Sequence, residues 1–163
     1  VQLVHYRGVQ EFYSSPWCGS ADTLLRRLTA VRCAAGLTQI GRVLEHVLGE
    51  ANRRPVNALV FVGDCVEEDP DRLADLAGRL GLMGVPAFVF QEGADPQAAR
   101  SLKTIAALSG GAYCPFDASS PELLRDLLSA VAVFAAGGRK ALEQFGRERG
   151  GAVLRLTRQI KKG

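Results

Sequence analysis

The sequence lacks the patterns that mark several well-known classes of protein. It has no apolar run near the roughly 20 residues that a membrane-spanning helix needs. It has no C-x-x-C pair of the kind that holds structural zinc, and no basic region interleaved with aromatics that would indicate a nucleic-acid module. Gly36 and Gly41 bracket Thr38, but neither a G-x-x-x-x-G-K-[ST] loop nor a G-x-G-x-x-G turn is present. A nucleotide-binding role therefore has little support.

Cysteine and histidine are also scarce. Small secreted scaffolds are far denser in cysteine, and three of the four cysteines lie in or beside apolar stretches, where a free thiol packs as a small hydrophobe. The four are Cys18, Cys33, Cys65 and Cys114. We therefore expect a reducing compartment and a cytoplasmic protein. The only histidines, His5 and His46, support no Ser-His-Asp or Cys-His arrangement.

What is present suits one globular domain. The chain has 163 residues, of which 47% are hydrophobic and 23% charged, and its net charge is +3. Basic residues are clustered only at the C-terminal end of the sequence, and such a cluster is commonly a solvated terminus. The chain begins at Val1 inside a strand-like run, so we expect a processed or trimmed product.

The first third of the chain predicts a hairpin and a helix. Two β-like runs, 1–6 and 9–13, are joined at Gly8, which supplies turn freedom. A helix is expected from Ala21 to Arg32, with Ser20 as its N-cap.

The remainder alternates between helix and strand. The apolar run at 56–63 predicts a strand buried on both faces, as in parallel sheets. Acid–proline and serine–proline pairs predict helix starts, and Gly110 predicts a helix end. In order, the expected elements are a helix from Thr38, a strand at 56–63, a helix after Asp69-Pro70, a strand at 85–90, a helix after Asp95-Pro96, a strand at 112–116 and a helix after Ser120-Pro121.

These units predict an α/β fold: a doubly wound, mostly parallel sheet with helices on both faces and an antiparallel edge hairpin. We expect the domain to span residues 1–136 and residues 137–163 to form a C-terminal basic extension. Within that extension, 139–149 is compatible with a polar helix, and 152–160 with a strand or an extended tail.

Two residues stand where open α/β sheets bind ligands, at the carboxyl ends of strands and the adjoining helix starts. Asp64 ends the strand at 56–63, and Thr38 follows a glycine turn and opens a helix. Each also has a purely structural interpretation, since threonine is a good N-cap and a strand-end aspartate can cap a turn.

Other side chains nearby are weaker candidates. The acidic run Glu67, Glu68, Asp69 and Asp71 suggests a metal site, but acids beside a helix N-terminus also complement its dipole, and we favour that interpretation. Cys65 is rejected as a nucleophile because its acidic neighbours raise the pKa of a thiol. Trp17 is either a partner contact or a cover over the core.

The order of these elements resembles the von Willebrand factor A family. The stretch GLTQIGRVLEHVL is similar to the family's threonine-led helix, and ALVFVGDC to its buried strand ending in aspartate. The hairpin VQLVHYRGVQEFY fits the family's second strand and its antiparallel partner, and VPAFVF and GGAYCPF fit its last two core strands. The resemblance spans about residues 1–134.

The resemblance implies a function. Family members hold a divalent ion, typically Mg²⁺, at the top of the sheet, with ligands that correspond to Thr38 and Asp64 and others from a D-x-S-x-S loop. An acidic side chain of a partner protein completes the coordination shell. We therefore expect a non-catalytic, Mg²⁺- or Mn²⁺-dependent protein-interaction module that binds neither nucleic acid nor membrane.

The sequence departs from the family in two ways. No D-x-S-x-S occurs, because the family's first strand and helix are absent, and Cys65 follows Asp64 where the family usually has glycine. The missing strand is central in the family, between the strands at 1–6 and 56–63, so both are expected to carry unpaired edges beside an apolar gap. Two alternatives stay open: a hydrolase or phosphotransfer enzyme using Asp64, and a degenerate, metal-free structural domain.

Overall fold

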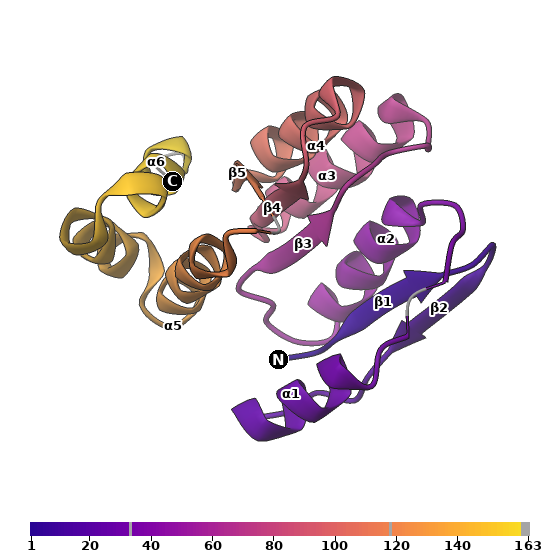
Figure 1. Cartoon of the computed structure of the whole chain (residues 1–163), viewed down its shortest axis with the longest axis horizontal. Coiled ribbons are helices and arrows are strands. Elements are labelled where there is room, and N and C mark those ends of the chain that lie inside the picture. The colour runs from indigo at the N-terminus through magenta and orange to yellow at the C-terminus, as the bar shows by residue number, and fades with distance from the viewer. Residues whose placement is uncertain (33, 118, 161–163) are drawn as a thin grey trace.

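The computed structural model describes residues 1–32, 34–117 and 119–160, and within them the strands form two separate sheets. β1 (Val4–Arg7) and β2 (Glu11–Ser14) pair antiparallel around the turn at Gly8 (φ 57°), as predicted. The second sheet is parallel, with the order β3-β4-β5. Its strands are β3 (Leu59–Gly63), β4 (Ala87–Glu92) and β5 (Ala112–Phe116). Figure 1 shows the hairpin beside this sheet.

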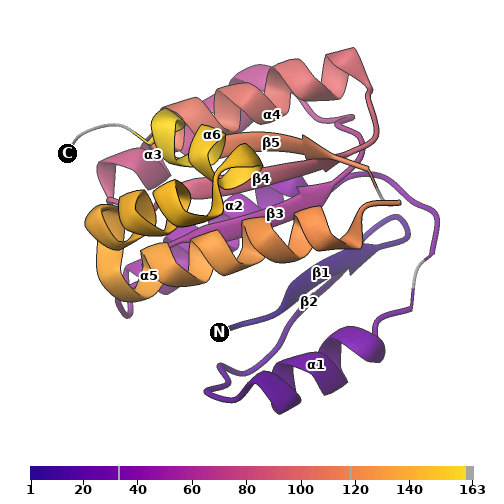
Figure 2. The ribbon, with the colours of Figure 1, turned by 60° about the vertical axis from the view of Figure 1, so that its left-hand side comes forward.

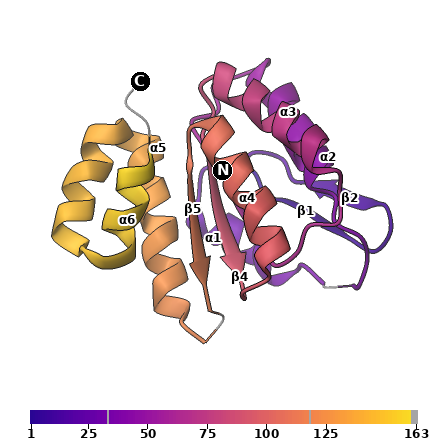
Figure 3. The same cartoon turned by 90° about the horizontal axis from the view of Figure 1, so that it is seen from above.

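Helices cover both faces of the parallel sheet (Figure 3). One face carries α2 (Ile40–Ala51), α3 (Pro70–Leu82) and α4 (Pro96–Ser109). The other carries α5 (Pro121–Arg149) and α6 (Gly151–Gln159). The remaining helix, α1 (Ala21–Thr29), lies beside the hairpin (Figure 2). The predicted α/β class, with helices on both faces and an antiparallel hairpin, is confirmed.

The side chains of β4 point alternately to the two faces of the sheet, and each face has its own hydrophobic core. Ala87 and Val89 face α2, α3 and α4, and pack with residues such as Ile40, Leu44 and Leu80. Phe88 and Phe90 face α5 and α6 instead. Because successive side chains of a strand point to opposite faces, one fully buried strand serves both cores. β4 is therefore the central strand that a continuous apolar run predicts.

The C-terminal residues help to build the second core. Leu142, Val153 and Leu156 are at most 2% exposed and pack with Phe88 and Phe90. The prediction of a strand or tail at 152–160 is wrong, since those residues lie almost entirely in α6. The chain turns into α6 at Gly150 and Gly151, and α5 itself is broken at Gly138 (φ 67°). Val153, Leu156 and Ile160 recur at helical spacing, and with packing partners available α6 buries Val153 and Leu156, while Ile160 is buried just after the helix ends.

β3 differs from its prediction. Only Phe61 is buried in this strand, whereas Val60 and Val62 are 37% and 46% exposed. The expectation of a strand buried on both faces is therefore wrong, because β3 is an edge strand that, among the strands the structure describes, pairs with β4 alone. Among the described residues no strand joins β1 to β3, which matches the unpaired edges expected from the sequence.

The predicted helix starts are mostly confirmed. The side chains of Ser20, Asp69 and Asp95 accept hydrogen bonds from backbone N–H groups of α1, α3 and α4, and Gly110 ends α4 with φ 77°. Ser120 precedes α5 without a capping hydrogen bond from its hydroxyl. Over the described residues, no helix combines the length and hydropathy needed to cross a bilayer.

Candidate functional site

The candidate site lies at the rim where the parallel strands end and α2 begins. α2 starts at Ile40 with Gln39 in the N-cap position, so the predicted helix start at Thr38 is two residues early. Thr38 is 9% exposed and lies in the connection just before the helix. Asp64 directly follows β3 and is exposed.

A reciprocal pair of hydrogen bonds ties Thr38 to the loop after β3. The Thr38 backbone N–H donates to Glu67 Oε2 (3.0 Å), and the Glu67 backbone N–H donates to Thr38 Oγ1 (3.0 Å). The Thr38 hydroxyl therefore caps no helix. It satisfies a backbone group of the acidic loop, a partner 29 residues away in the sequence.

Glu68 supplies the cap that α2 lacks. Its carboxylate accepts hydrogen bonds from the backbone N–H groups of Ile40 and of Gly41, the latter at 2.9 Å. A Cβ on Gly41 would lie 2.9 Å from Glu68 Oε2, so glycine gives the carboxylate room to approach. Negative charge at a helix N-terminus is favourable because the free N–H groups there carry partial positive charge. We expected these acids to complement the dipole of the helix that follows them in the sequence. Glu68 does complement a helix dipole, but that of α2.

The phenol of Tyr6 lies under this loop. Burial, followed by the charges of Glu68, Cys65 and Asp64, raises its pKa to about 12, and a backbone hydrogen bond with Gln39 acts in the opposite direction. The hydrogen bonds between Thr38 and Glu67, together with the position of Asp64 directly after β3, put Thr38 and the loop of Asp64 at the same rim, as their positions in the sequence suggest.

Cys65 lacks the environment of a nucleophile. Burial raises the pKa of its thiol, a hydrogen bond with Asp64 raises it further, and the charges of Asp64, Glu67 and Asp95 add to the effect. A reactive cysteine needs a lowered thiol pKa, which cationic neighbours provide. The rim offers carboxylates instead. Cys18 and Cys114 are likewise free thiols, and Cys33 lies outside the described residues.

The rim offers oxygen donors, which a hard cation such as Mg²⁺ prefers, but it offers too few of them to fill the coordination shell. Thr38 Oγ1 and the Asp64 carboxylate are oxygen donors of the type that Mg²⁺ prefers, yet Mg²⁺ takes six ligands. The carboxylates of Glu67 and Glu68 are already engaged by backbone N–H groups. Across the described parts of the chain, no three His, Cys, Asp or Glu side chains are placed to hold a metal ion.

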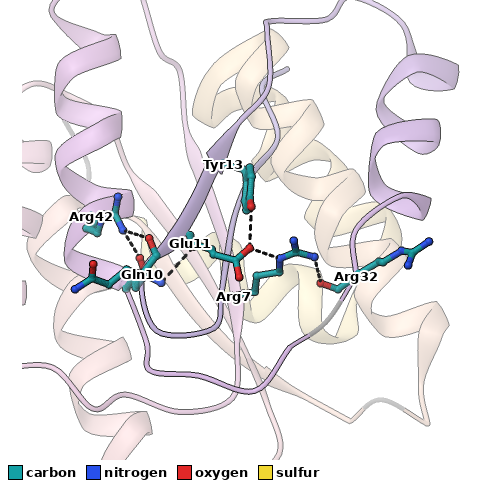
Figure 4. A network of polar contacts seen from close by, with 7 residues as sticks. Arg7, Gln10, Glu11, Tyr13, Arg32 and Arg42 are labelled. Carbon is teal, nitrogen blue, oxygen red and sulfur yellow. Dashed lines mark hydrogen bonds and ion pairs between the residues drawn. The ribbon is translucent and has the colours of Figure 1, made fainter.

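A second polar cluster lies at the turn of the hairpin (Figure 4). Arg7 Nε and the Tyr13 hydroxyl both donate to Glu11 Oε2, at 2.8 and 2.7 Å, and these bonds, Tyr13 first, lower the pKa of Glu11. Arg7 also donates to the Arg32 carbonyl, and Arg42 to the Gln10 carbonyl. These exposed groups satisfy one another and fasten the hairpin to its neighbours, so the cluster is structural.

Trp17 anchors the loop after β2. Its Nε1 donates to Glu50 Oε2 (2.6 Å) near the end of α2, and the Arg54 guanidinium lies 5.4 Å from the centre of its ring. At 37% exposure the indole is half covered. The indole belongs to neither core cluster, so it lies against the end of α2 and does not cover the core, and its role as a partner contact stays a prediction.

Comparisons with known proteins identify no relative. No protein-family model matches the chain, no curated protein matches it, and no solved structure matches it. The fold and the rim geometry therefore carry the functional argument alone.

Proposed function

We propose that this chain is a non-catalytic protein-interaction module of the von Willebrand factor A type. It binds a carboxylate of a partner protein at the rim formed by the end of β3 and the start of α2, through Mg²⁺ or Mn²⁺. The observation that supports this proposal is the reciprocal Thr38–Glu67 pair, which holds a hydroxyl and the carboxylate-rich loop of Asp64 at one rim.

Asp64 and Thr38 would supply the protein's oxygen donors to the cation. Asp64 is exposed and offers a carboxylate to the cation, while Thr38 Oγ1 offers a second oxygen. A cation there would supply the positive charge that an otherwise acidic rim lacks for attracting a carboxylate. Two protein donors leave the rest of the shell to water and to the partner, so we expect weak binding of the free ion.

Titration calorimetry with Mn²⁺ and Mg²⁺ tests the proposal. Saturable binding is expected for the wild type and a loss of about tenfold or more for Asp64→Asn, because outer-sphere or direct ligands typically contribute on that scale. Asp22→Asn, which changes an exposed aspartate in the first turn of α1, is the matched control and leaves the affinity unchanged.

A metal-free interaction domain is the second candidate. It is favoured by the fact that Thr38 Oγ1 and the carboxylates of Glu67 and Glu68 already have backbone partners. Absence of saturable binding by the folded wild type would select this candidate over the first, whereas equal binding by Asp64→Asn would show that the ion binds without this carboxylate and would contradict both.

A further inference from the structure

The β1–β2 hairpin has two faces with different neighbours. Because the side chains of a strand alternate between faces, the register partners Tyr6 and Phe12 lie on one face. The register partners His5 and Tyr13 lie on the other. The first face packs on α2, since Tyr6 contacts its core cluster and the ring centre of Phe12 lies 5.7 Å from that of His46. The second face is turned toward α1 (Figure 2).

An open hollow of about 240 Å³ lies between this second face and the end of α1. We call it the hairpin hollow. The hairpin contributes Leu3, His5 and Tyr13 to its lining, and the end of α1 contributes Arg27, Ala30 and Val31. The last three are spaced i, i+3 and i+4, so they lie on one side of the helical turn. A space of this size suits a molecule on the order of ten non-hydrogen atoms, since a water in the liquid fills roughly 30 Å³.

Arg27 brings a fixed positive charge to the hairpin hollow. Its Nη1 donates to Ser15 Oγ (2.9 Å) and to the Pro16 carbonyl, so two neutral oxygens hold the guanidinium in place. A guanidinium has five N–H donors, which leaves the edge formed by Nε and Nη2. Within residues 1–32, 34–117 and 119–160, no side chain or carbonyl accepts a hydrogen bond from that edge, and no carboxylate forms an ion pair with Arg27.

The acids closest in sequence or register do not compensate this charge. Glu11 accepts hydrogen bonds from the Tyr13 hydroxyl (2.7 Å) and from Arg7 Nε (2.8 Å), so its charge is paired with Arg7 (Figure 4). Asp22, the acid of α1, is five residues before Arg27. Helical side chains meet at spacings of three or four. The hairpin hollow therefore combines an uncompensated cation with apolar walls.

We propose that the hairpin hollow binds a small organic carboxylate. The Nε–Nη2 edge of Arg27 pairs with the two carboxylate oxygens, the geometry that a guanidinium offers to this group. The apolar body of the ligand lies against Leu3 and Val31, and a few polar groups in an apolar hollow are typical of small-molecule sites. An inorganic anion would leave the apolar walls in water. A neutral apolar molecule would give the guanidinium no partner.

A ligand in this position also secures α1. The helix has no buried residue of its own, and the hairpin hollow exists only while α1 lies against the hairpin. A ligand that binds the closed arrangement alone stabilises it in proportion to one plus the ratio of ligand concentration to dissociation constant. At ten times the dissociation constant, the amides of α1 should therefore exchange about tenfold more slowly.

The experiment uses the full chain in metal-free buffer with EDTA, so its outcome is independent of the metal proposal. The probe is phenylacetate, and phenylacetamide is its neutral counterpart of the same shape. Binding is followed by NMR chemical shifts and amide hydrogen exchange. Saturable binding of phenylacetate is expected with a dissociation constant of about 1 mM or tighter, with shifts confined to the hairpin and α1. Phenylacetamide should bind about tenfold more weakly or worse.

Two variants and a control locate the site. Arg27→Gln should lower the affinity for phenylacetate about tenfold or more, because the charged fork is lost. Ala30→Glu keeps Arg27 and its anchors but places a carboxylate three residues away, so it should block the probe to a similar extent. Arg26→Gln removes the same charge from the neighbouring position, which is exposed and outside the lining, and should bind as the wild type does.

Three results would overturn the proposal. The first is the absence of saturable shifts up to about 10 mM phenylacetate in the folded wild type. The second is equal affinity for phenylacetate and phenylacetamide, or equal binding by Arg27→Gln and Arg26→Gln. The third is displacement of phenylacetate by an equal concentration of inorganic phosphate, which would show that the apolar walls contribute nothing.

Discussion

At the scale of single residues, Glu68 has the largest structural role at the rim. Its carboxylate binds the first N–H groups of α2, a helix whose own N-cap residue makes no side-chain bond. Glu68→Ala leaves those donors without their partner. We expect it to lower the free energy of unfolding by about 1–3 kcal/mol, measured by urea denaturation. Glu122→Ala, which removes an exposed acid from the first turn of α5, should change it by about 0.5 kcal/mol or less.

Gly36 and Gly49 differ in whether the structure has room for a side chain in their place. A Cβ on Gly36 would lie 1.8 Å from the carbonyl oxygen of Gly8, whereas one on Gly49 in α2 would meet nothing within 4 Å. Gly36→Ala must push the hairpin turn away and should destabilise the chain by about 1–3 kcal/mol. Gly49→Ala should stabilise it by about 0.5–1 kcal/mol, because alanine favours a helix. Thermal unfolding of both variants tests this opposite sign.

Tyr6 predicts a loss of stability at alkaline pH. Its pKa is raised to about 12 in the folded chain against the usual 10, so the folded state retains a proton that the unfolded state releases. The stabilisation is therefore complete below pH 10 and is lost as the pH rises toward 12. Urea denaturation between pH 9 and 12 should show a shallower decline for Tyr6→Phe. An equally steep decline in this variant would contradict the assignment.

The residue types at the rim were predictable from the sequence, but their partners were not. Thr38 and Asp64 stand at element ends, and the carboxyl rim of an α/β sheet gathers such positions. The bond between the Thr38 hydroxyl and the Glu67 backbone joins residues 29 positions apart. Local pattern gives no information on such a pair, so the sequence offered only two roles for Thr38, a metal ligand or the cap of its own helix, and not this hydrogen bond.

At the scale of elements, α1 is the least secured helix among those described. It has no buried residue, and Leu25 and Leu28 are 60% and 47% exposed. Helices hold their shape mainly through a buried face. We therefore expect its backbone amides to exchange on the order of a hundredfold faster than those of α2, as NMR-detected hydrogen exchange would measure. Similar protection in the two helices would show that α1 is covered in solution.

The periodicity of apolar residues predicted most helices and strands. It failed where the packing of neighbouring elements determines burial or secondary structure. The apolar runs of β3 and β4 look alike in sequence, yet β4 is central and β3 is an edge strand. Which of two apolar strands becomes central depends on what pairs with it, and that lies outside either run. Likewise, residues 152–160 form α6 because a second core receives their apolar side chains.

At the scale of the whole molecule, the two cores share one thin sheet. The α5–α6 side contains Leu156, which is fully buried, while Leu128 on α5 faces outward and is 42% exposed. Leu156→Ala should cost about 2–5 kcal/mol of unfolding free energy, as large-to-small core changes do. Leu128→Ala should cost about 0.5 kcal/mol or less. Equal losses in urea denaturation would mean that the C-terminal helices are not part of the cooperative unit.

α2 is held at both ends by side chains from distant parts of the chain. Glu68 accepts hydrogen bonds from its first turn, and Glu50 near its last turn accepts one from the indole of Trp17. Trp17 is the only tryptophan of the sequence. Any event at the rim that shifts this helix along its axis changes the contact made by that indole. We therefore expect any such shift of α2 to change the tryptophan emission of the unlabelled protein, and a fluorescence titration would detect it at the far end of the helix.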